Sequence, residues 1–183
     1  KDSVFSPVDN LFGFAGISST GIQNKFEGQI HTGKLIESLS IKAAGAGVHF
    51  IGGVHALAHK VEAGGVQLET RDHGVIATKK LLLATNGYTQ DYLPGLVNPA
   101  RAQVLITEPI AGLKIEGTFH LDQGYYYFRN IDGRILLGGG RNLDFEGERT
   151  TSEQTTDHIQ DALERILHEV ILPESKVTIA ARW

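Results

Sequence analysis

The sequence predicts a mixed α+β fold in which helices accompany an antiparallel sheet. A helical pattern begins at Thr32, where apolar residues recur every three or four positions and two glycines follow. Beyond residue 100, strand-like segments alternate with turn residues, and residues 130–133 have the composition of a hairpin turn. The apolar run at residues 81–84 indicates one further strand, buried on both faces as in a parallel sheet.

The first half of the chain predicts one helix followed by short strands. Residues 1–31 are Gly-rich and predict irregular structure. We expect Thr32 to cap the helix and Gly45 and Gly47 to end it. Its apolar stripe, with a spacing of three to four residues, is Leu35, Ile36, Leu39 and Ala43. The strands are expected at residues 48–51, 54–62, 66–70, 75–78 and 81–85.

The second half predicts a sheet with one helix against it. Strands are expected at residues 101–108, 125–129, 134–138 and 176–182. A helix is expected over residues 152–168, with cap chemistry from Ser152, Thr155 and Thr156 and a buried face of Ile159, Leu163, Ile166 and Leu167. The expected strands are short before Pro94 and Pro99 and long and antiparallel after them. We therefore place a domain boundary there, between residues 1–97 and 98–183.

Composition excludes several classes of protein. A net charge of -4 and a pI of 6.1 argue against a nucleic-acid or membrane-surface binder, because both usually carry a basic patch. The absence of cysteine excludes disulfides and thiolate metal sites, and it fits a cytoplasmic location. No stretch approaches ~18 consecutive apolar residues, so no membrane span is predicted. The dispersed histidines lack zinc-site spacing, and no metal is expected.

Residues 79–88 form the strongest local signal for a ligand. An apolar run ends abruptly in the small and polar residues Ala84, Thr85, Asn86 and Gly87. In open α/β sheets ligands bind at the carboxyl ends of strands, and small residues let a backbone approach a cofactor closely. An ordinary strand-to-loop transition is the alternative.

Several segments, in this order, resemble the D-amino-acid-oxidase superfamily of FAD-dependent oxidoreductases, which includes glycine and sarcosine oxidases. These segments are residues 28–35 before the helix, residues 83–88, the pair 126–129 and 132–140, and the terminal residues 181–183. The resemblance implies a partial FAD-binding domain over residues 1–97. It implies a substrate-binding domain, an antiparallel sheet with a helix, over residues 98–183.

The resemblance also implies site residues. Val54 would meet the adenine end of FAD, and Ala84, Thr85, Asn86 and Gly87 would line the cofactor. Tyr126 and Phe128 share one strand face, and in relatives that face looks onto substrate and flavin. Plain sheet packing is the alternative for both. Arg129 and Arg141 are candidates to hold a substrate carboxylate through the planar guanidinium, and solvated surface positions are the alternative.

Two departures from the family pattern bear on the cofactor. No Gly-x-Gly-x-x-Gly turn for the pyrophosphate occurs in the sequence, and Gly138–Gly140 follows a strand without opening a βαβ unit. Leu136 stands near the position where sarcosine-oxidase relatives place a lysine over the flavin. We therefore expect an internal segment of a longer flavoenzyme, which binds FAD in the full-length protein and weakly or not at all alone.

The resemblance implies oxidation of a C–N bond in a small amine or amino acid, by hydride transfer to FAD. The residues that carry out the chemistry are not identified by the sequence. Oxidation of a C–O bond, as in flavin-dependent 2-hydroxy-acid or glycerol-phosphate dehydrogenases, is one alternative. A non-catalytic binding module is the other.

Overall fold

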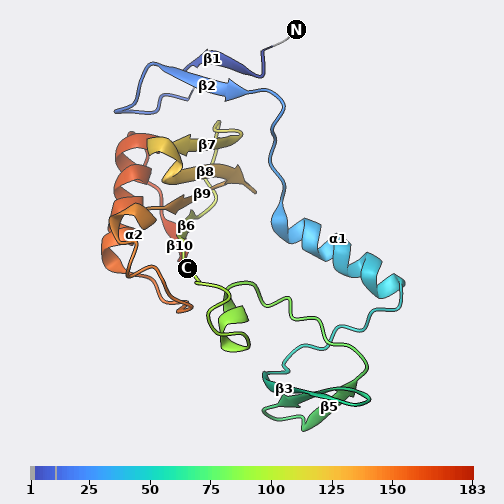
Figure 1. The fold of residues 1–183 in the computed structure, drawn as a ribbon. Coiled ribbons are helices and arrows are strands. Elements are labelled where there is room, and N and C mark those ends of the chain that lie inside the picture. Colours follow the sequence, from blue (N-terminus) through green and yellow to red (C-terminus); the bar gives the residue numbers. More distant parts are fainter. Residues whose placement is uncertain (1–2, 11) are drawn as a thin grey trace. The chain divides into compact units, whose positions relative to one another are not determined.

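The computed structural model describes residues 3–10 and 12–183, which form two compact units (Figure 1). The first unit, here called the small unit, comprises residues 32–99. The second, the large unit, joins residues 100–183 to the residues before Thr32. The expected division into an FAD-binding region, residues 1–97, and a substrate-binding region, residues 98–183, stays a prediction.

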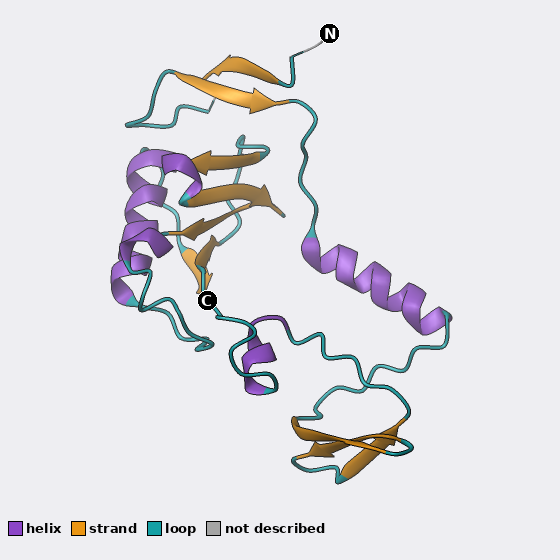
Figure 2. Ribbon diagram, in the orientation of Figure 1, coloured by secondary structure: helices purple, strands orange, loops and turns teal. Residues whose placement is uncertain are grey.

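The large unit is built on a five-stranded antiparallel sheet with the strand order β10-β6-β9-β8-β7 (Figure 2). Its strands are β6 (Gln103–Thr107), β7 (Thr118–Leu121), β8 (Tyr126–Ile131), β9 (Arg134–Gly139) and β10 (Ile179–Arg182). The expected hairpin is confirmed between β8 and β9. Asp132 and Gly133 take φ values of 46° and 71°, as a two-residue type I′ turn requires.

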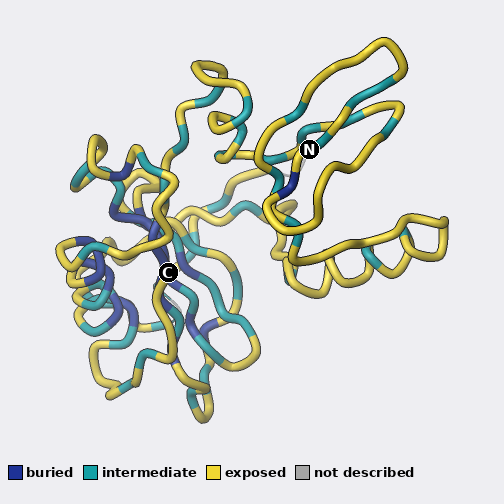
Figure 3. Tube along the Cα trace, turned by 90° about the horizontal axis from the view of Figure 1, so that it is seen from below, coloured by how far each residue is buried: buried dark blue, intermediate teal, exposed yellow. Residues whose placement is uncertain are grey.

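A helical segment covers one face of this sheet (Figure 1). It consists of α2 (Asp157–Arg165) and a π-helical continuation, η4 (Ile166–Ile171). Ile159 and Leu163, one turn apart, are fully buried against the sheet residues Leu105 and Leu137. Figure 3 shows that the buried residues gather in α2 and the strands beneath it. The mixed α+β class with an antiparallel sheet is therefore confirmed.

The α2 helix begins five residues later than expected, because its first polar residues have other partners. Thr156 is the N-cap residue, but its side chain caps no backbone N–H. Its Oγ1 instead accepts a hydrogen bond from Nε2 of the buried Gln103 on β6 at 2.7 Å. A tertiary contact thus sets where this helix starts, and the sequence alone does not show it.

The small unit contains the expected helix and a three-stranded meander. The helix α1 (Thr32–Gly45) has the predicted limits, and Gly47 follows it with a φ of 92°. The strands are β3 (Ala56–Glu62), β4 (Gly65–Thr70) and β5 (Val75–Thr78), paired in the order β3-β4-β5. All three strands are close to the ranges predicted from the turns at residues 63–65 and 71–74.

The predictions of two strands in this region are wrong. Residues 48–51 and 81–85 have no strand structure, and Leu82 is 87% exposed. A parallel strand buried on both faces needs a hydrogen-bonded neighbour on each side. None of the described strands lies beside residues 81–85, so the apolar run remains extended without pairing. It leads into a 3₁₀ helix, η1 (Asn86–Asp91).

The N-terminal segment is more regular than predicted. It forms a hairpin of β1 (Phe5–Asp9) and β2 (Thr20–Asn24), where we expected irregular structure. Between the strands, Phe12 and Phe14 pack against the core of the large unit, and Ala15 donates its N–H to Val170 O at 2.9 Å. Long-range aromatic packing therefore orders a segment whose local sequence is rich in glycine.

Within the described residues, no helix has both the length and the apolar character needed to cross a membrane.

Candidate functional site

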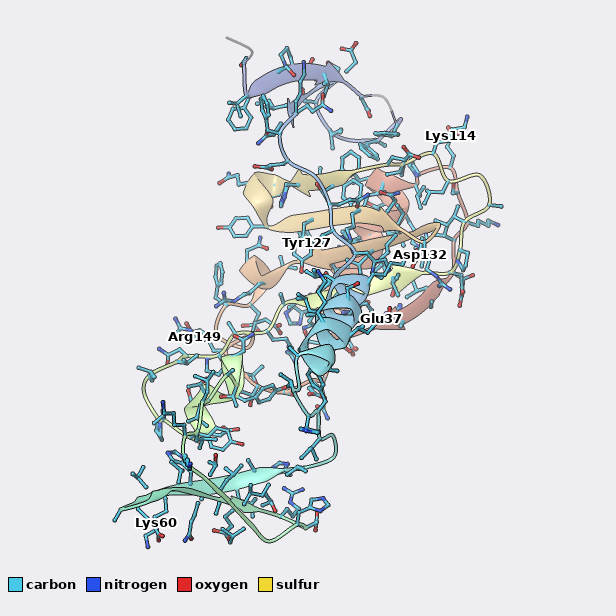
Figure 4. The ribbon with its side chains drawn as sticks, turned by 90° about the vertical axis from the view of Figure 1, so that its right-hand side faces the viewer. Glu37, Lys60, Lys114, Tyr127, Asp132 and Arg149 are labelled. Atoms are coloured by element: carbon cyan, nitrogen blue, oxygen red, sulfur yellow. The ribbon has the colours of Figure 1, made fainter. Side chains whose placement is uncertain are left out.

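One face of the five-stranded sheet is packed by α2, and the other face carries the polar and aromatic side chains of interest. Strand residues alternate between faces. Tyr126 and Phe128 therefore point to the helix side, and Tyr127 and Arg129 point away from it. Figure 4 shows the sheet from the side away from α2, with Tyr127 labelled on β8. We call this side of the sheet the open face.

The structure places Tyr126 and Phe128 in the hydrophobic core. The Phe128 side chain is 2% exposed, and its ring is stacked on Phe119 with centroids 4.6 Å apart. Phe14 meets the same ring edge-on at 5.3 Å. These contacts correspond to the packing alternative, because a ring enclosed by aromatic neighbours has no surface left for substrate. A substrate role for Tyr126 and Phe128 stays a prediction, and it would require the core to open.

Arg129 extends along the open face, where its guanidinium already has an acceptor. Its Nη1 donates to the backbone carbonyl of Ile30 at 2.5 Å. The same stretch of chain is attached twice more, by a Gln29–Asn130 hydrogen bond at 3.0 Å and a His31–Asp132 contact at 3.2 Å. Arg129 therefore helps to hold residues 29–31 against the end of the sheet, as one of several such links.

Arg141 lies in a different setting, at the end of β9. Gly140 has a φ of 77°, which turns the chain out of the sheet and places Arg141 in the following 3₁₀ turn. The Arg141 guanidinium carbon lies 5.5 Å from the centroid of Phe145, a cation–π arrangement. Its Nε is buried and has no hydrogen-bond acceptor among the described residues.

Two further tyrosines lie at this end of the sheet, Tyr125 just before β8 and Tyr127 within it. The Tyr125 ring centroid lies 6.4 Å from that of Phe145, and the carbonyl of Tyr125 accepts the Gly140 N–H at 3.0 Å. Tyr127 lies directly opposite Gly138 on β9. A methyl group at residue 138 would come within 2.6 Å of the Tyr127 hydroxyl, so the glycine provides the space that the ring occupies. We call Tyr125, Arg141 and Phe145 the aromatic–arginine cluster.

The pKa values of the two tyrosines in β8, Tyr126 and Tyr127, are raised. Burial raises the pKa of Tyr127. Burial is also the main reason that the pKa of Tyr126 is raised, and the nearby Asp122 adds to it while Arg165 opposes it. Both phenols are therefore neutral hydrogen-bonding groups near pH 7, and neither can serve as a base there.

The residues expected to line the cofactor lie in two loops of the small unit. Val54 is half-buried just before β3, and Thr85 is the N-cap of η1, with its hydroxyl 3.0 Å from that of Thr89. Ala84 and Asn86 are exposed, and Gly87 is half-buried. Tyr92, which follows η1, donates its hydroxyl to the Ala56 carbonyl at 3.0 Å and so connects the two loops.

The turn at this corner does not depend on the conformational freedom of Gly87. Its φ is not positive, and a methyl group there would meet only Pro99 at 3.6 Å. Asn86 carries the left-handed conformation instead, with a φ of 46°. Asparagine tolerates this region better than most residues, because its short side chain can bond locally.

Among the described residues, no group of three or more histidine, aspartate or glutamate side chains is placed to hold a metal ion.

Sequence reasoning found Arg141 but missed its neighbours. Phe145 lies four residues beyond Arg141 in a loop rich in glycine and acidic residues, which has no strand or helix periodicity to indicate where the ring points. The expectation that the Tyr126 and Phe128 face of β8 meets substrate stays a prediction, and the structure shows that α2 covers this face. The pattern Tyr126, Phe128 alternating with Tyr127, Arg129 leaves this choice open, because aromatic residues occur on both sides.

Among protein-family models, one matches most of this chain. The family model described as FAD dependent oxidoreductase (DAO) matches residues 5–183. No curated protein sequence matches the chain.

Solved structures with a similar fold include glycine oxidase from Bacillus cereus, with a TM-score of 0.68 and 12% identity over 90% of this chain and 46% of that one. NikD, an unusual amino acid oxidase essential for nikkomycin biosynthesis, has a TM-score of 0.66 and 19% identity over 97% of this chain and 53% of its own. L-proline dehydrogenase from P. horikoshii has a TM-score of 0.62 and 17% identity over 90% and 44%. The chain thus spans about half the length of these structures.

Proposed function

Because this chain belongs to the FAD-dependent oxidoreductase family, we propose that it is the substrate-recognising part of an enzyme that oxidises the C–N bond of a small amino acid. The similar structures are described as acting on amino acids, and this supports the choice of substrate class. We also propose that it works in the cytoplasm, as the lack of cysteine suggests. The observation that carries the proposal is the arrangement around Arg141.

Arg141 suits a carboxylate better than Arg129 does. Arg129 donates to the Ile30 carbonyl, whereas Arg141 pairs with no carboxylate among the described residues and its Nε has no acceptor there. The Arg141 guanidinium carbon lies 5.5 Å from the centroid of the Phe145 ring, and a planar guanidinium beside such a ring can give a carboxylate two parallel hydrogen bonds. Arg141 would therefore orient an amino-acid substrate by its carboxylate.

The other members of the aromatic–arginine cluster would shape the space beside that carboxylate. Tyr125 and Phe145 are 41% and 46% exposed, so their ring surfaces are accessible, and a substrate bound against them would displace water from the charge pair. Fixed orientation of this kind contributes roughly 7–11 kcal/mol of barrier reduction in the most favourable cases.

The residues present fit one part of the cofactor. The exposed corner at Ala84 and Asn86, the Thr85 hydroxyl and the connected Val54 loop offer small residues and accessible backbone to a dinucleotide. The sequence has no glycine-rich turn for the pyrophosphate, so these residues would hold FAD together with further groups. When bound, FAD accepts the hydride from the carbon that bears nitrogen.

The test compares matched substrates with the FAD-loaded full-length protein and a dye acceptor. Glycine, sarcosine and L-proline each have a partner without the carboxylate (methylamine, dimethylamine and pyrrolidine) and a hydroxy-acid counterpart such as glycolate or lactate. We expect dye reduction and an imine-derived product with at least one amino acid, at a kcat/KM roughly a hundredfold above that of its amine. Turnover of hydroxy acids alone would identify a C–O oxidising enzyme. A colourless protein that acts on none of these compounds would indicate a binding module.

A further inference from the structure

The loop that carries Arg141 and Phe145 is attached to the sheet at its first residue. We call residues 140–148 the arginine loop. Gly140 donates its N–H to the Tyr125 carbonyl at 3.0 Å and then takes a left-handed conformation, with a φ of 77°. A side chain there would also press against Ile159 and Tyr126, at 3.3 and 3.4 Å. This end of the loop is therefore fixed by backbone contacts.

The middle of the arginine loop is a tight turn organised by Asp144. Its carboxylate Oδ1 accepts the Gly147 N–H at 2.8 Å, and its backbone carbonyl accepts the Glu148 N–H at 3.1 Å. A Cβ on residue 147 would meet the Asp144 carboxylate, so the present hydrogen-bonded position of that side chain requires a glycine there. Phe145 lies inside this turn. A shift of Glu148 would therefore move Phe145 relative to the Arg141 guanidinium.

The far end of the loop is held by a buried ion pair. The Glu148 side chain is 1% exposed and meets Arg101 through two hydrogen bonds, from Nε to Oε2 at 2.9 Å and from Nη2 to Oε1 at 2.5 Å. The Arg101 N–H also donates to the Glu148 carbonyl at 2.8 Å. Arg101 thus fixes both the side chain and the backbone of Glu148.

Gln103 extends this attachment to α2. Its Nε2 donates to Glu148 Oε1 at 2.9 Å and to Thr156 Oγ1 at 2.7 Å, and its Oε1 accepts the Thr156 N–H at 3.0 Å. Gln103 is fully buried on β6, so its amide cannot turn to other partners. The loop end, the sheet and the start of α2 therefore share one hydrogen-bond network.

Stability alone is a weak reason for burying this ion pair. Taking two charges out of water costs several kcal/mol per ion, and an apolar pair of similar volume is often equally stable. What a bidentate ion pair adds is a defined geometry, because a carboxylate and a guanidinium meet in few arrangements. Glu148 is the last residue of the loop that begins with Gly140 and Arg141. The geometry it imposes therefore acts on Arg141 through the short Asp144 turn.

We propose that Glu148, held by Arg101 and Gln103, is a positioning residue for Arg141. It fixes the arginine loop so that the Arg141 guanidinium and Phe145 meet a substrate carboxylate in one orientation. This inference rests on the proposed function, because it assigns to Glu148 a role in carboxylate recognition by the same site.

The test is Glu148→Gln in the FAD-loaded full-length protein. The amide keeps the size of the side chain but loses the charge and places a donor against Arg101 or Gln103. We expect the KM of the amino-acid substrate to rise roughly ten- to hundredfold, as for a displacement of about 1 Å at a substrate-orienting group. We expect the Ki or KM of the matching amine, which has no carboxylate, to change less than about twofold. Amide hydrogen exchange in residues 141–148 should speed up, and this readout does not depend on turnover.

Glu108→Gln is the matched control. Glu108 follows the other end of β6 and pairs with Arg134 at 3.2 Å, outside the arginine loop. The same chemical change there should leave both KM values and the exchange of the loop unaltered. Arg101→Lys is the conservative second variant, because it keeps the positive charge and loses the bidentate geometry. We expect it to raise the KM of the amino acid by less than Glu148→Gln does, and it provides the same test if Glu148→Gln does not fold.

The outcomes separate the two proposals. If Arg141→Met leaves the KM of the amino acid unchanged, the proposed function of Arg141 is wrong. If Arg141→Met raises that KM but neither Glu148→Gln nor Arg101→Lys does, the carboxylate site stands and the positioning role of Glu148 is wrong. An equal rise of the KM for amino acid and amine in Glu148→Gln would also overturn the positioning role, because it would indicate a general structural change.

Discussion

Tyr127 and Gly138 lie directly opposite each other across β8 and β9, and the phenol ring covers the position that a side chain on residue 138 would fill. A Cβ at that position would lie 2.6 Å from the Tyr127 hydroxyl and 2.7 Å from Val104 on the other neighbouring strand. The first glycine of the Gly138–Gly140 run therefore serves side-chain packing on the open face. The packing of Tyr127 accounts for Gly138, so a phosphate-binding role is not needed to explain this glycine.

Gly138→Ala should displace the Tyr127 ring. Since Val104 blocks the other direction, we expect a loss of about 1–3 kcal/mol in the free energy of unfolding, as for an overpacked site. Urea unfolding of the variant measures this. Gly28→Ala is the control, because a Cβ there would meet no atom within 4 Å. The double variant Gly138→Ala with Tyr127→Val should recover most of the loss, and a double variant as unstable as the single one would contradict the packing role.

Alkaline pH should destabilise the large unit through Tyr126 and Tyr127, whose pKa values are raised by burial. Burial raises the pKa values of Tyr126 and Tyr127, whereas both phenols ionise near their ordinary value of about 10 in the unfolded chain. The unfolded state therefore binds fewer protons above that pH, and the free energy of unfolding falls as pH rises toward the folded-state pKa values. Urea unfolding between pH 8 and pH 11 measures the slope, which Tyr127→Phe should reduce. An unchanged slope in this variant would exclude Tyr127 as a contributor.

Acid should weaken the attachment of the arginine loop. The hydrogen bond from Arg101 is the main reason that the pKa of Glu148 is lowered, Gln103 assists, and burial opposes both. Because the folded-state pKa lies below the unfolded one, this carboxylate stabilises the fold above the unfolded value of about 4.3. The stabilisation is lost as pH falls through the lower folded-state pKa.

The variant Glu148→Gln separates this contribution. At pH 7 it should cost about 3–5 kcal/mol, because it leaves the buried Arg101 without its partner. The cost should shrink as the pH is lowered, since the wild-type carboxylate is then neutral too. Urea unfolding at pH 7, 5 and 3 makes the comparison. A cost that is constant across this range would show that the charge of Glu148 plays no part.

Phe128→Ala distinguishes a core residue from a substrate contact. Loss of a ring enclosed by Phe14 and Phe119 should lower the free energy of unfolding by about 3–5 kcal/mol. The KM of the folded fraction at low temperature should stay within about twofold of the wild type. Tyr125→Phe, just before β8, is the comparison variant with little expected loss of stability, because the Tyr125 side chain is exposed. A large KM change in Phe128→Ala with unchanged stability would restore Phe128 as a substrate residue.

Much of the fold followed from local sequence patterns. The α1 helix, the β3–β5 meander and the β8–β9 hairpin were predicted close to their observed limits, because apolar periodicity and turn residues act over a few positions. Predictions failed where a segment depends on distant partners. Residues 81–85 were expected to form a buried strand and have no described neighbour to pair with, and the start of α2 is set by the side chain of Gln103.

The candidate site divides in the same way. Sequence alone determined the α+β class, pointed to the family by the order of its motifs, and singled out Arg141 after the glycine run. Only the tertiary structure decided which face of β8 is covered by α2, and so moved Phe128 into the core and left Tyr127 outside. It also brought Phe145 beneath Arg141 and Glu148 against Arg101. The physical reason is that alternation in a strand separates two faces but does not say which one a helix from elsewhere in the chain will cover.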